Sequence, residues 1–219
     1  MSCSVVVLIS GSGSNLQALI DQSLQGDLDI DIKAVISNKA SAYGLERASN
    51  ADIATHALDH KQFESREAFD QALMTLIDQY QPKLVILAGF MRILTENFTR
   101  HYEGRMLNIH PSLLPKYKGL NTHQRAIDAG ETEHGVSVHF VTSELDAGSV
   151  VLQASAEISS DETADSLAKK VHNLEHIIYP LSVKWFSLGR LTLQEGKALL
   201  DGKPLPLSGV RYTTELNDH

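Results

Sequence analysis

The chain has 219 residues, of which 42% are hydrophobic and 21% are charged, values that indicate a folded globular protein rather than a disordered one. Its 27 acidic residues outnumber 19 basic ones and give a formal net charge of −8, which disfavours a nucleic-acid polymer as partner. The single cysteine, Cys3, can form no internal disulfide, and the short apolar run near the start predicts neither a signal peptide nor a membrane span. We therefore expect a soluble cytoplasmic protein.

Strands and helices alternate through the first half of the chain. Apolar runs predict strands at residues 5–9, 32–37, 54–58, 83–90 and 105–110. Helical spacing predicts helices at 15–25, 43–51 and 65–80, with a short helical piece before residue 105. Strands that are apolar on both faces and alternate with helices indicate an α/β fold, with a mostly parallel twisted sheet and helices on both of its faces.

The pattern changes after Pro111. The segment SLLPKYKGLNTH is predicted to be a long polar connection, and residues 135–141 and 149–158 alternate apolar with polar residues, as antiparallel strands do. A long helix is predicted from about residue 163 to 188. We expect one domain over residues 1–219, with an N-terminal half to about 110, a C-terminal half at 111–193 and a tail at 194–219, of which residues 201–219 are expected to be frayed.

The first predicted strand runs into the loop GSGSN, which opens a helix. Its spacing does not match the P-loop, and it lacks the third glycine and the acidic residue of a dinucleotide site. The N–H groups of Gly13, Ser14 and Asn15 would then hold a single phosphate or similar anion at the helix N-terminus. The loop fits equally well an ordinary strand–helix turn capped by Ser14 or Asn15.

Asn108 and His110 lie two apart on a predicted strand, so their side chains share one face. Pro111 ends that strand at the edge where open α/β sheets bind ligands. An amide and an imidazole there would both donate hydrogen bonds to an oxyanion, and a nearby carboxylate, Asp146, would favour the charged imidazolium. The spacing by itself fits better a strand-end histidine and an unrelated aspartate in a turn.

The segment HNLEH, residues 172–176, matches the zinc-protease pattern H-x-x-E-H. Helical spacing places its histidines away from the apolar stripe, towards solvent, and Lys170 and Glu175 on the borders of that stripe. A catalytic zinc needs a third ligand, and the sequence indicates none, so we expect no metal site. The predicted core-facing stripe of this helix consists of Leu167, Val171, Leu174, Ile178, Leu181 and Trp185.

Several separated motifs resemble those of the phosphoribosylglycinamide formyltransferases, folate-dependent enzymes of purine synthesis. They are VLISGSGSNLQALI, VISNKASAYGLERA, LAGFMRIL, LNIHPSLLPKYKG, EHGVSVHFV, ELDAG and DETADSLAKKVHNLEHIIYP. The resemblance implies transfer of a formyl group from 10-formyltetrahydrofolate, as co-substrate, to the amine of glycinamide ribonucleotide, without a metal. Because of this resemblance, we favour an active site at Asn108, His110 and Asp146 over a strand-end histidine with an unrelated aspartate in a turn.

The resemblance also implies the roles of individual residues. Gly13, Ser14 and Asn15 would hold the 5′-phosphate of the ribonucleotide. Asn108 and His110 would stabilise the oxyanion, and Asp146 would keep His110 charged and relay a proton to the leaving folate nitrogen. The remaining implied roles are Lys170 near the phosphate, Glu175 on the ribose hydroxyls and His139 in support behind the catalytic residues.

The same resemblance places the folate against Met91, Arg92, Ile93 and Leu94, with Arg66 close to its glutamyl carboxylate. The pterin ring would lie under a loop. The resemblance assigns Asn108 and the residues of this loop to folate binding, and the loop consists of Thr142, Ser143, Glu144, Leu145 and Asp146. Two positions depart from the common pattern of relatives: Lys118 and Ser149 each stand where a proline is frequent. Either departure would alter loop closure.

Three alternatives remain open at this point. A formyltetrahydrofolate hydrolase would share the three catalytic residues but would carry an additional N-terminal domain. A methionyl-tRNA formyltransferase would need a C-terminal RNA-binding domain and a basic surface. A non-catalytic protein that binds phosphorylated metabolites would bind the ribonucleotide without turnover. The sequence leaves monomer and homodimer equally open.

Overall fold

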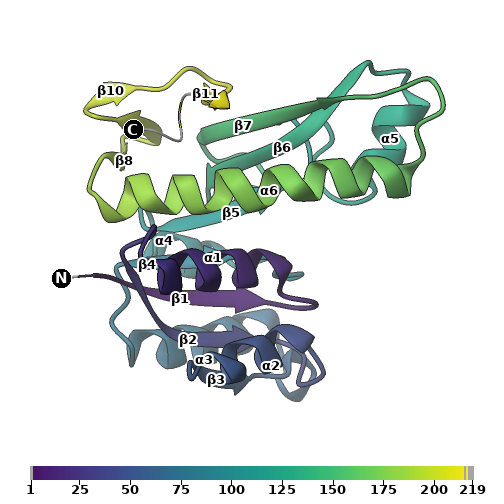
Figure 1. The fold of residues 1–219 in the computed structure, drawn as a ribbon. Coiled ribbons are helices and arrows are strands. Elements are labelled where there is room, and N and C mark those ends of the chain that lie inside the picture. Colours follow the sequence, from purple (N-terminus) through teal and green to yellow (C-terminus); the bar gives the residue numbers. More distant parts are fainter. Residues whose placement is uncertain (1, 215, 217–219) are drawn as a thin grey trace. The chain divides into compact units, whose positions relative to one another are not determined.

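The computed structural model describes residues 2–214 and 216; Met1, Glu215 and residues 217–219, which include the end of the expected tail, lie outside the described part. The chain divides into two units, Met1–Asn108 and Ile109–His219. Both units combine strands with helices (Figure 1). Among the described helices, none is both long and apolar enough to cross a membrane.

A parallel sheet with strand order β3–β2–β1–β4–β5 forms the centre of the first unit. Most side chains of β1 and all those of β4 are buried, because helices cover the sheet. The strand order reverses between β1 and β4, and open α/β sheets bind ligands beyond the carboxyl ends of such strands. The strands are β1 (Cys3–Ile9), β2 (Ile30–Ser37), β3 (Ala54–Ala57), β4 (Leu84–Leu87) and β5 (Met106–His110).

Two helices of the first unit, α3 and α4, begin at side chains that cap their free N–H groups. The hydroxyl oxygens of Ser65 and Thr95 accept from the backbone N–H groups of Ala68 and Phe98. Helices α1 and α2 lie on one face of the sheet and α3 and α4 on the other (Figure 1). The helices are α1 (Ser14–Gln25), α2 (Tyr43–Asn50), α3 (Arg66–Asp78), α4 (Glu96–His101) and the 3-10 helix η1 (His60–Gln62).

The second unit is built on an antiparallel pair, β6 (Glu133–Phe140) and β7 (Val150–Glu157). The long helix α6 (Ala164–Ser187) lies along these strands (Figure 1). Thr163 caps it through a reciprocal pair of hydrogen bonds with Ser166. The predicted stripe of α6 is buried except at Leu174, which is half-buried.

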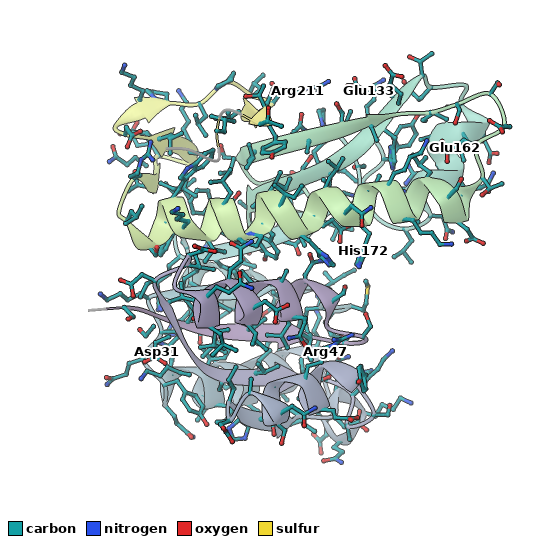
Figure 2. The ribbon with its side chains drawn as sticks, in the orientation of Figure 1. Asp31, Arg47, Glu133, Glu162, His172 and Arg211 are labelled. Atoms are coloured by element: carbon teal, nitrogen blue, oxygen red, sulfur yellow. The ribbon has the colours of Figure 1, made fainter. Side chains whose placement is uncertain are left out.

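The second unit also contains short elements that the sequence did not predict. The expected polar connection at residues 112–123 ends where the helix α5 (Thr122–Asp128) begins. The stretch 201–219, predicted to be frayed, contains β10 (Lys203–Pro204) and β11 (Val210–Arg211), so that prediction is wrong. These strands follow β8 (Leu191–Gln194) and β9 (Lys197–Leu200). Such short elements carry no measurable period in sequence, and tertiary pairing decides them: β11 pairs with β7, and Arg211 forms an ion pair with Glu133 (Figure 2).

The predicted fold class is confirmed. The sheet is mostly parallel, helices cover it, and the antiparallel strands are confined to the C-terminal part of the chain. Loops that carry predicted functional residues begin at the carboxyl ends of β1, β4 and β5.

Candidate active site

His110, the last residue of β5, contacts the carboxylate of Asp146. The Nδ1 atom of His110 lies 3.4 Å from Oδ2 of Asp146, and both side chains are less than a tenth exposed. The Nε2 atom of His110 lies 2.9 Å from the carbonyl oxygen of Tyr117. A carbonyl only accepts, so Nε2 carries a proton, and a second proton on Nδ1 would face the carboxylate. The surroundings of this ring therefore suit the charged imidazolium.

The loop that follows β5 holds the aspartate as well as the histidine. The backbone N–H of Gly119 donates to Oδ2 of Asp146 at 3.0 Å. Asp146 itself has a left-handed backbone, with φ 48°, which aims its side chain back into the unit. The sequence analysis missed Tyr117 and Gly119, because they act through backbone groups that their side-chain identities do not reveal.

His139 lies on β6 behind this pair. Its Nδ1 donates to the carbonyl oxygen of Phe140 at 2.8 Å, so the neutral ring turns an unprotonated Nε2 towards Asp146, 3.8 Å from Oδ1. Burial lowers the pKa of His139 to about 4, and the attraction of Asp146 opposes that shift only in part. The buried surroundings of His139 therefore favour its neutral form.

Asn108 occupies the position on β5 two residues before His110, so the two side chains project from the same face of the strand. In the first unit it is in register with Leu87, the last residue of β4. The amide of Asn108 therefore stands at the carboxyl end of the parallel sheet, where the sequence analysis expected it.

The GSGSN loop has the geometry of an anion-binding turn. Gly13 is the N-cap of α1, with φ 70° and no side-chain cap, so the alternative of a turn capped by Ser14 or Asn15 is wrong. A Cβ atom on Gly13 would lie 2.6 Å from the Cα of Gly44, so this close approach requires glycine. The helix N-terminus therefore presents backbone N–H groups and the positive end of its dipole.

The side chain of Arg47, on α2, forms a hydrogen bond with the backbone of the same loop. Its Nε donates to the carbonyl oxygen of Ser12 at 2.8 Å, and its Nη1 donates to Oε1 of Gln17 at 3.1 Å. The guanidinium also lies 4.8 Å from the centre of the Tyr43 ring. Figure 2 labels Arg47 in the first unit. Neither Arg47 nor Gly44 stood out in the sequence, because each supports the loop from a distant helix.

The loop after β4 is tied to the loop after β1. The hydroxyl of Ser10 accepts from the N–H of Met91 at 2.7 Å and donates to Oδ1 of Asn38 at 2.5 Å. The side chains of Met91 and Ile93 are 63% and 55% exposed, whereas Leu94 is buried. An exposed apolar pair on an anchored loop is a suitable surface for a flat aromatic ligand.

Two arginines of the first unit surround a buried carboxylate. Asp70 accepts from the N–H of Thr95 at 2.6 Å, and burial raises its pKa although the charges of Arg66 and Arg92 act in the opposite direction. The guanidinium of Arg92 lies 5.7 Å from the centre of the Phe69 ring, and the side chain of Arg66 is about half exposed. The predicted folate residues Arg66 and Arg92 therefore share one neighbourhood.

Glu175, on α6, interacts with His172 and His123. Its Oε2 accepts a hydrogen bond from Nδ1 of His172 at 3.2 Å, which raises the pKa of His172 (Figure 2). Burial lowers the pKa of His123, while the nearby charge of Glu175 raises it and that of His110 lowers it further. Glu175 and His110 thus act on the same half-buried histidine, so the predicted ribose-binding residue lies in the electrostatic neighbourhood of His110. The sequence analysis missed His123.

Lys170 is paired with a carboxylate just before the start of α6. Its ammonium forms an ion pair with Glu162 and donates to the carbonyl oxygen of Glu157 at 3.4 Å. Glu162 also accepts from the hydroxyl of Ser159 at 2.8 Å, and these hydrogen bonds lower its pKa to about 2. The described contacts of Lys170 therefore stabilise the start of α6 (Figure 2).

The loop predicted to cover the folate connects β6 to β7. The Thr142 hydroxyl donates to the carbonyl oxygen of Glu144 at 3.2 Å, and Leu145 is half exposed. Both departures from the common pattern make contacts that proline could not make. The Lys118 ammonium pairs with Glu144 at 3.2 Å, and the Ser149 hydroxyl accepts from the N–H of Ala198 at 2.9 Å.

The histidines of the H-x-x-E-H segment contact each other. The rings of His172 and His176 are 4.4 Å apart between centres, at an interplanar angle of 61°. The side chain of His172 is 43% exposed, in line with the predicted solvent-facing position, and His176 is partly exposed. Within residues 2–214 and 216, no three His, Cys, Asp or Glu side chains lie together as metal ligands would.

Comparison with known proteins defines the class. Residues 3–183 match the family model described as formyl transferase, and the chain belongs to this family. It is 55% identical to the phosphoribosylglycinamide formyltransferase of Escherichia coli K12 over 94% of this chain and 97% of that protein, and 49% identical, over the same shares, to that of Haemophilus influenzae. A solved phosphoribosylglycinamide formyltransferase from Coxiella burnetii is 56% identical, with a TM-score of 0.94 over 97% of this chain and all of that one.

Proposed function

We propose that this protein is a phosphoribosylglycinamide formyltransferase, which transfers the formyl group of 10-formyltetrahydrofolate to the amine of glycinamide ribonucleotide in purine synthesis. The names of close, full-length relatives support the reaction. The observation that carries the chemistry is the buried His110, whose two ring nitrogens face a carbonyl oxygen and a carboxylate. The proposal includes a cytoplasmic location, which suits a chain whose one cysteine, Cys3, is free and buried.

In the proposed mechanism, Asn108 and His110 stabilise the oxyanion that forms when the amine attacks the formyl carbon. The His110 Nε2–H, now bonded to Tyr117, would be shared with the developing oxyanion in a three-centre hydrogen bond. The negative charge of Asp146 keeps the ring protonated in a site shielded from water. Each donor of this kind accounts for about 10²- to 10³-fold in turnover.

Proton balance assigns a second role to the pair. The amine loses a proton as the new C–N bond forms, and the folate nitrogen gains one as its bond to the formyl carbon breaks. We assign the relay to Asp146 and His110, through an intervening water. His139, neutral and buried behind the carboxylate, takes no part in the transfer in this scheme.

The ribonucleotide would be held by its phosphate and its ribose. The uncapped N-terminus of α1 at Gly13, Ser14 and Asn15 supplies N–H groups for the phosphate. Glu175 would accept hydrogen bonds from the ribose hydroxyls. We also propose that Lys170 lies near the phosphate. This assignment has the least support, because the ammonium of Lys170 is paired with Glu162.

The folate would lie on the exposed side chains of the β4 loop. Met91 and Ile93 supply apolar surface, and Arg66 and Arg92 supply positive charge for a glutamyl carboxylate. The remaining proposed contacts are Leu94, Asn108 and the loop residues Thr142, Ser143, Glu144, Leu145 and Asp146. These residues fit an aromatic ligand with an acidic tail, which is the chemistry of a folate. We propose no metal, and either a monomer or a homodimer would be compatible with this scheme.

The decisive experiment follows release of the folate product spectroscopically from a 10-formyl-folate donor, with and without glycinamide ribonucleotide. Release that requires the ribonucleotide supports the transferase. Release without it would indicate a hydrolase, in which water replaces the amine. No release under either condition, together with ribonucleotide binding in calorimetry, would indicate a non-catalytic binding protein.

A further inference from the structure

Backbone groups of one short loop hold both members of the catalytic pair. Residues 116–120, which we call the clamp loop, contribute the Tyr117 carbonyl oxygen to His110 and the Gly119 N–H to Asp146. These two contacts fix the plane of the imidazole and the orientation of the carboxylate. The alignment of the pair thus depends on where the clamp loop lies.

The backbone of the clamp loop adopts a conformation that contacts with other residues must stabilise. Tyr117 has φ 55° and Gly119 has φ 80°. A left-handed conformation is unfavourable by about 1 kcal/mol or more for a residue with a side chain, and it persists only where neighbouring groups impose it. The structure must therefore supply contacts that keep residues 116–120 in place.

Arg125, from the first turns of α5, supplies such contacts. Its Nη1 donates to the carbonyl oxygen of Lys118 at 2.7 Å and to that of Leu120 at 3.2 Å, on either side of Gly119. Its guanidinium also lies 5.3 Å from the centre of the Tyr117 ring. Arg125 thereby contacts the carbonyl oxygens on both sides of Gly119, which binds Asp146. It also contacts the ring of Tyr117, whose carbonyl oxygen binds His110.

Glu131 restrains the other end of the loop. Its carboxylate accepts from the Lys116 ammonium at 2.7 and 2.9 Å and from the Tyr117 hydroxyl at 2.8 Å. These contacts hold side chains, whereas Arg125 holds the backbone carbonyls that flank Gly119. Arg125 is therefore the residue whose loss would release the backbone of the clamp loop most directly.

We propose that Arg125 is a positioning residue for formyl transfer: it holds the clamp loop so that the backbone at Tyr117 and Gly119 aligns His110 with Asp146. The inference rests on the proposed function. Arg125 touches neither reacting group itself, so its effect falls on turnover rather than on ribonucleotide binding. Misplacement of a catalytic group by about 1 Å lowers turnover by up to about 100-fold.

The test compares Arg125→Met, which keeps an apolar stem without donors, with Arg125→Lys, which keeps a donor. We expect kcat to fall about 10- to 100-fold in Arg125→Met, with partial recovery in Arg125→Lys. The dissociation constant for the ribonucleotide should change less than about twofold, a difference of only ~0.4 kcal/mol. The matched control is Gln124→Met on the same helix, because Gln124 bonds only to Asp128 among its described contacts.

The outcomes separate this proposal from the proposed function. If the wild-type protein transfers formyl groups and Arg125→Met keeps at least half of its kcat, the role of Arg125 is refuted and the function stands. An equal loss in Gln124→Met, or a loss that follows a lowered melting temperature in both Arg125 variants, also refutes it. If the wild type shows no ribonucleotide-dependent transfer, the proposed function fails first.

Discussion

The Nε2 atom of His110 lies 2.9 Å from the carbonyl oxygen of Tyr117, seven residues further along the chain. The connection after β5 therefore turns back over the end of its own strand. The first part of that connection is pinned by buried side chains: the Ser137 hydroxyl donates to the Ser112 carbonyl oxygen at 2.7 Å, and Gln153 donates to that of Leu114 at 2.9 Å. The loop that binds His110, the proposed catalytic histidine, is thus held by side chains of the antiparallel strands.

Replacing Asp146 by Asn should lower kcat by about 10²- to 10⁴-fold, the range found for a positioned acid–base group. The amide keeps the size of the side chain and an acceptor for Gly119, but it removes the charge that faces Nδ1 of His110. Steady-state kinetics with both substrates measures the loss, and calorimetry should show nearly unchanged ribonucleotide binding. Asp128→Asn, an exposed change on α5, is the control. A near-normal kcat in Asp146→Asn would refute the assigned role.

Replacing Gly44 by Ala should raise the KM for the ribonucleotide at least about tenfold, the effect of losing roughly 1.4 kcal/mol of phosphate binding. The added Cβ would lie 2.4 Å from Cδ1 of Ile9, which must shift, and 3.1 Å from the Cα of Gly13, so the GSGSN loop must give way slightly. Arg47→Met, which removes the hydrogen bond to Ser12, should act in the same direction with less strain.

Gly26→Ala at the other end of α1 is the matched control for the loop variants. Gly26 also has a positive φ, but open space surrounds its Cβ position. This change should cost about 1 kcal/mol of stability without altering the KM for the ribonucleotide. If all three variants raise KM equally, the GSGSN loop has no special role in phosphate binding.

Replacing Glu175 by Gln should weaken ribonucleotide binding by about 10- to 100-fold, because a hydrogen bond to a charged group contributes about 1.5–3 kcal/mol. Folate affinity should not change. Calorimetric titration of the ribonucleotide gives the dissociation constant directly. Asp165→Asn, an exposed change on the same helix, should have no effect, and an unaltered constant in Glu175→Gln would contradict the assignment to the ribose.

Acid should destabilise the second unit through His134. This residue is 1% exposed, and burial lowers its pKa from 6.5 to about 4, with the neighbouring charge of His123 acting in the same direction. The folded state holds the neutral ring, so the stabilisation is complete above pH 6.5 and is lost as the pH falls from 6.5 towards 4. The loss amounts to about 3 kcal/mol.

Urea unfolding at a series of pH values tests this prediction. His134→Gln should flatten the dependence between pH 6.5 and 4, since the amide does not titrate. His101→Gln should leave the dependence as in the wild type, because the side chain of His101 is 42% exposed to solvent. Equal slopes in all three proteins would show that burial of His134 does not control the acid sensitivity.

Much of the fold could be predicted because its signals are local. The run of apolar residues in β1 follows from burial on two faces, and the helical spacing of α3 and α6 follows from burial of one stripe. The alternation in β6 and β7 correctly indicated strands, but the open face that alternation predicts is wrong, because both faces of β6 and of the first part of β7 are buried. The short helix α5 and the strands after residue 194 could not be predicted in this way, since tertiary contacts stabilise them.

By itself, the sequence determined the fold class, the glycine loop at the start of α1 and the placement of Asn108 and His110 on one face of β5, because strand and helix periods depend only on neighbouring residues. Only the tertiary structure decided that Asp146 lies 3.4 Å from His110, that Lys170 pairs with Glu162, and that Tyr117 and Gly119 act through their backbones. Contacts between residues distant in sequence depend on how loops return to the sheet, and backbone groups are the same in every residue type except proline.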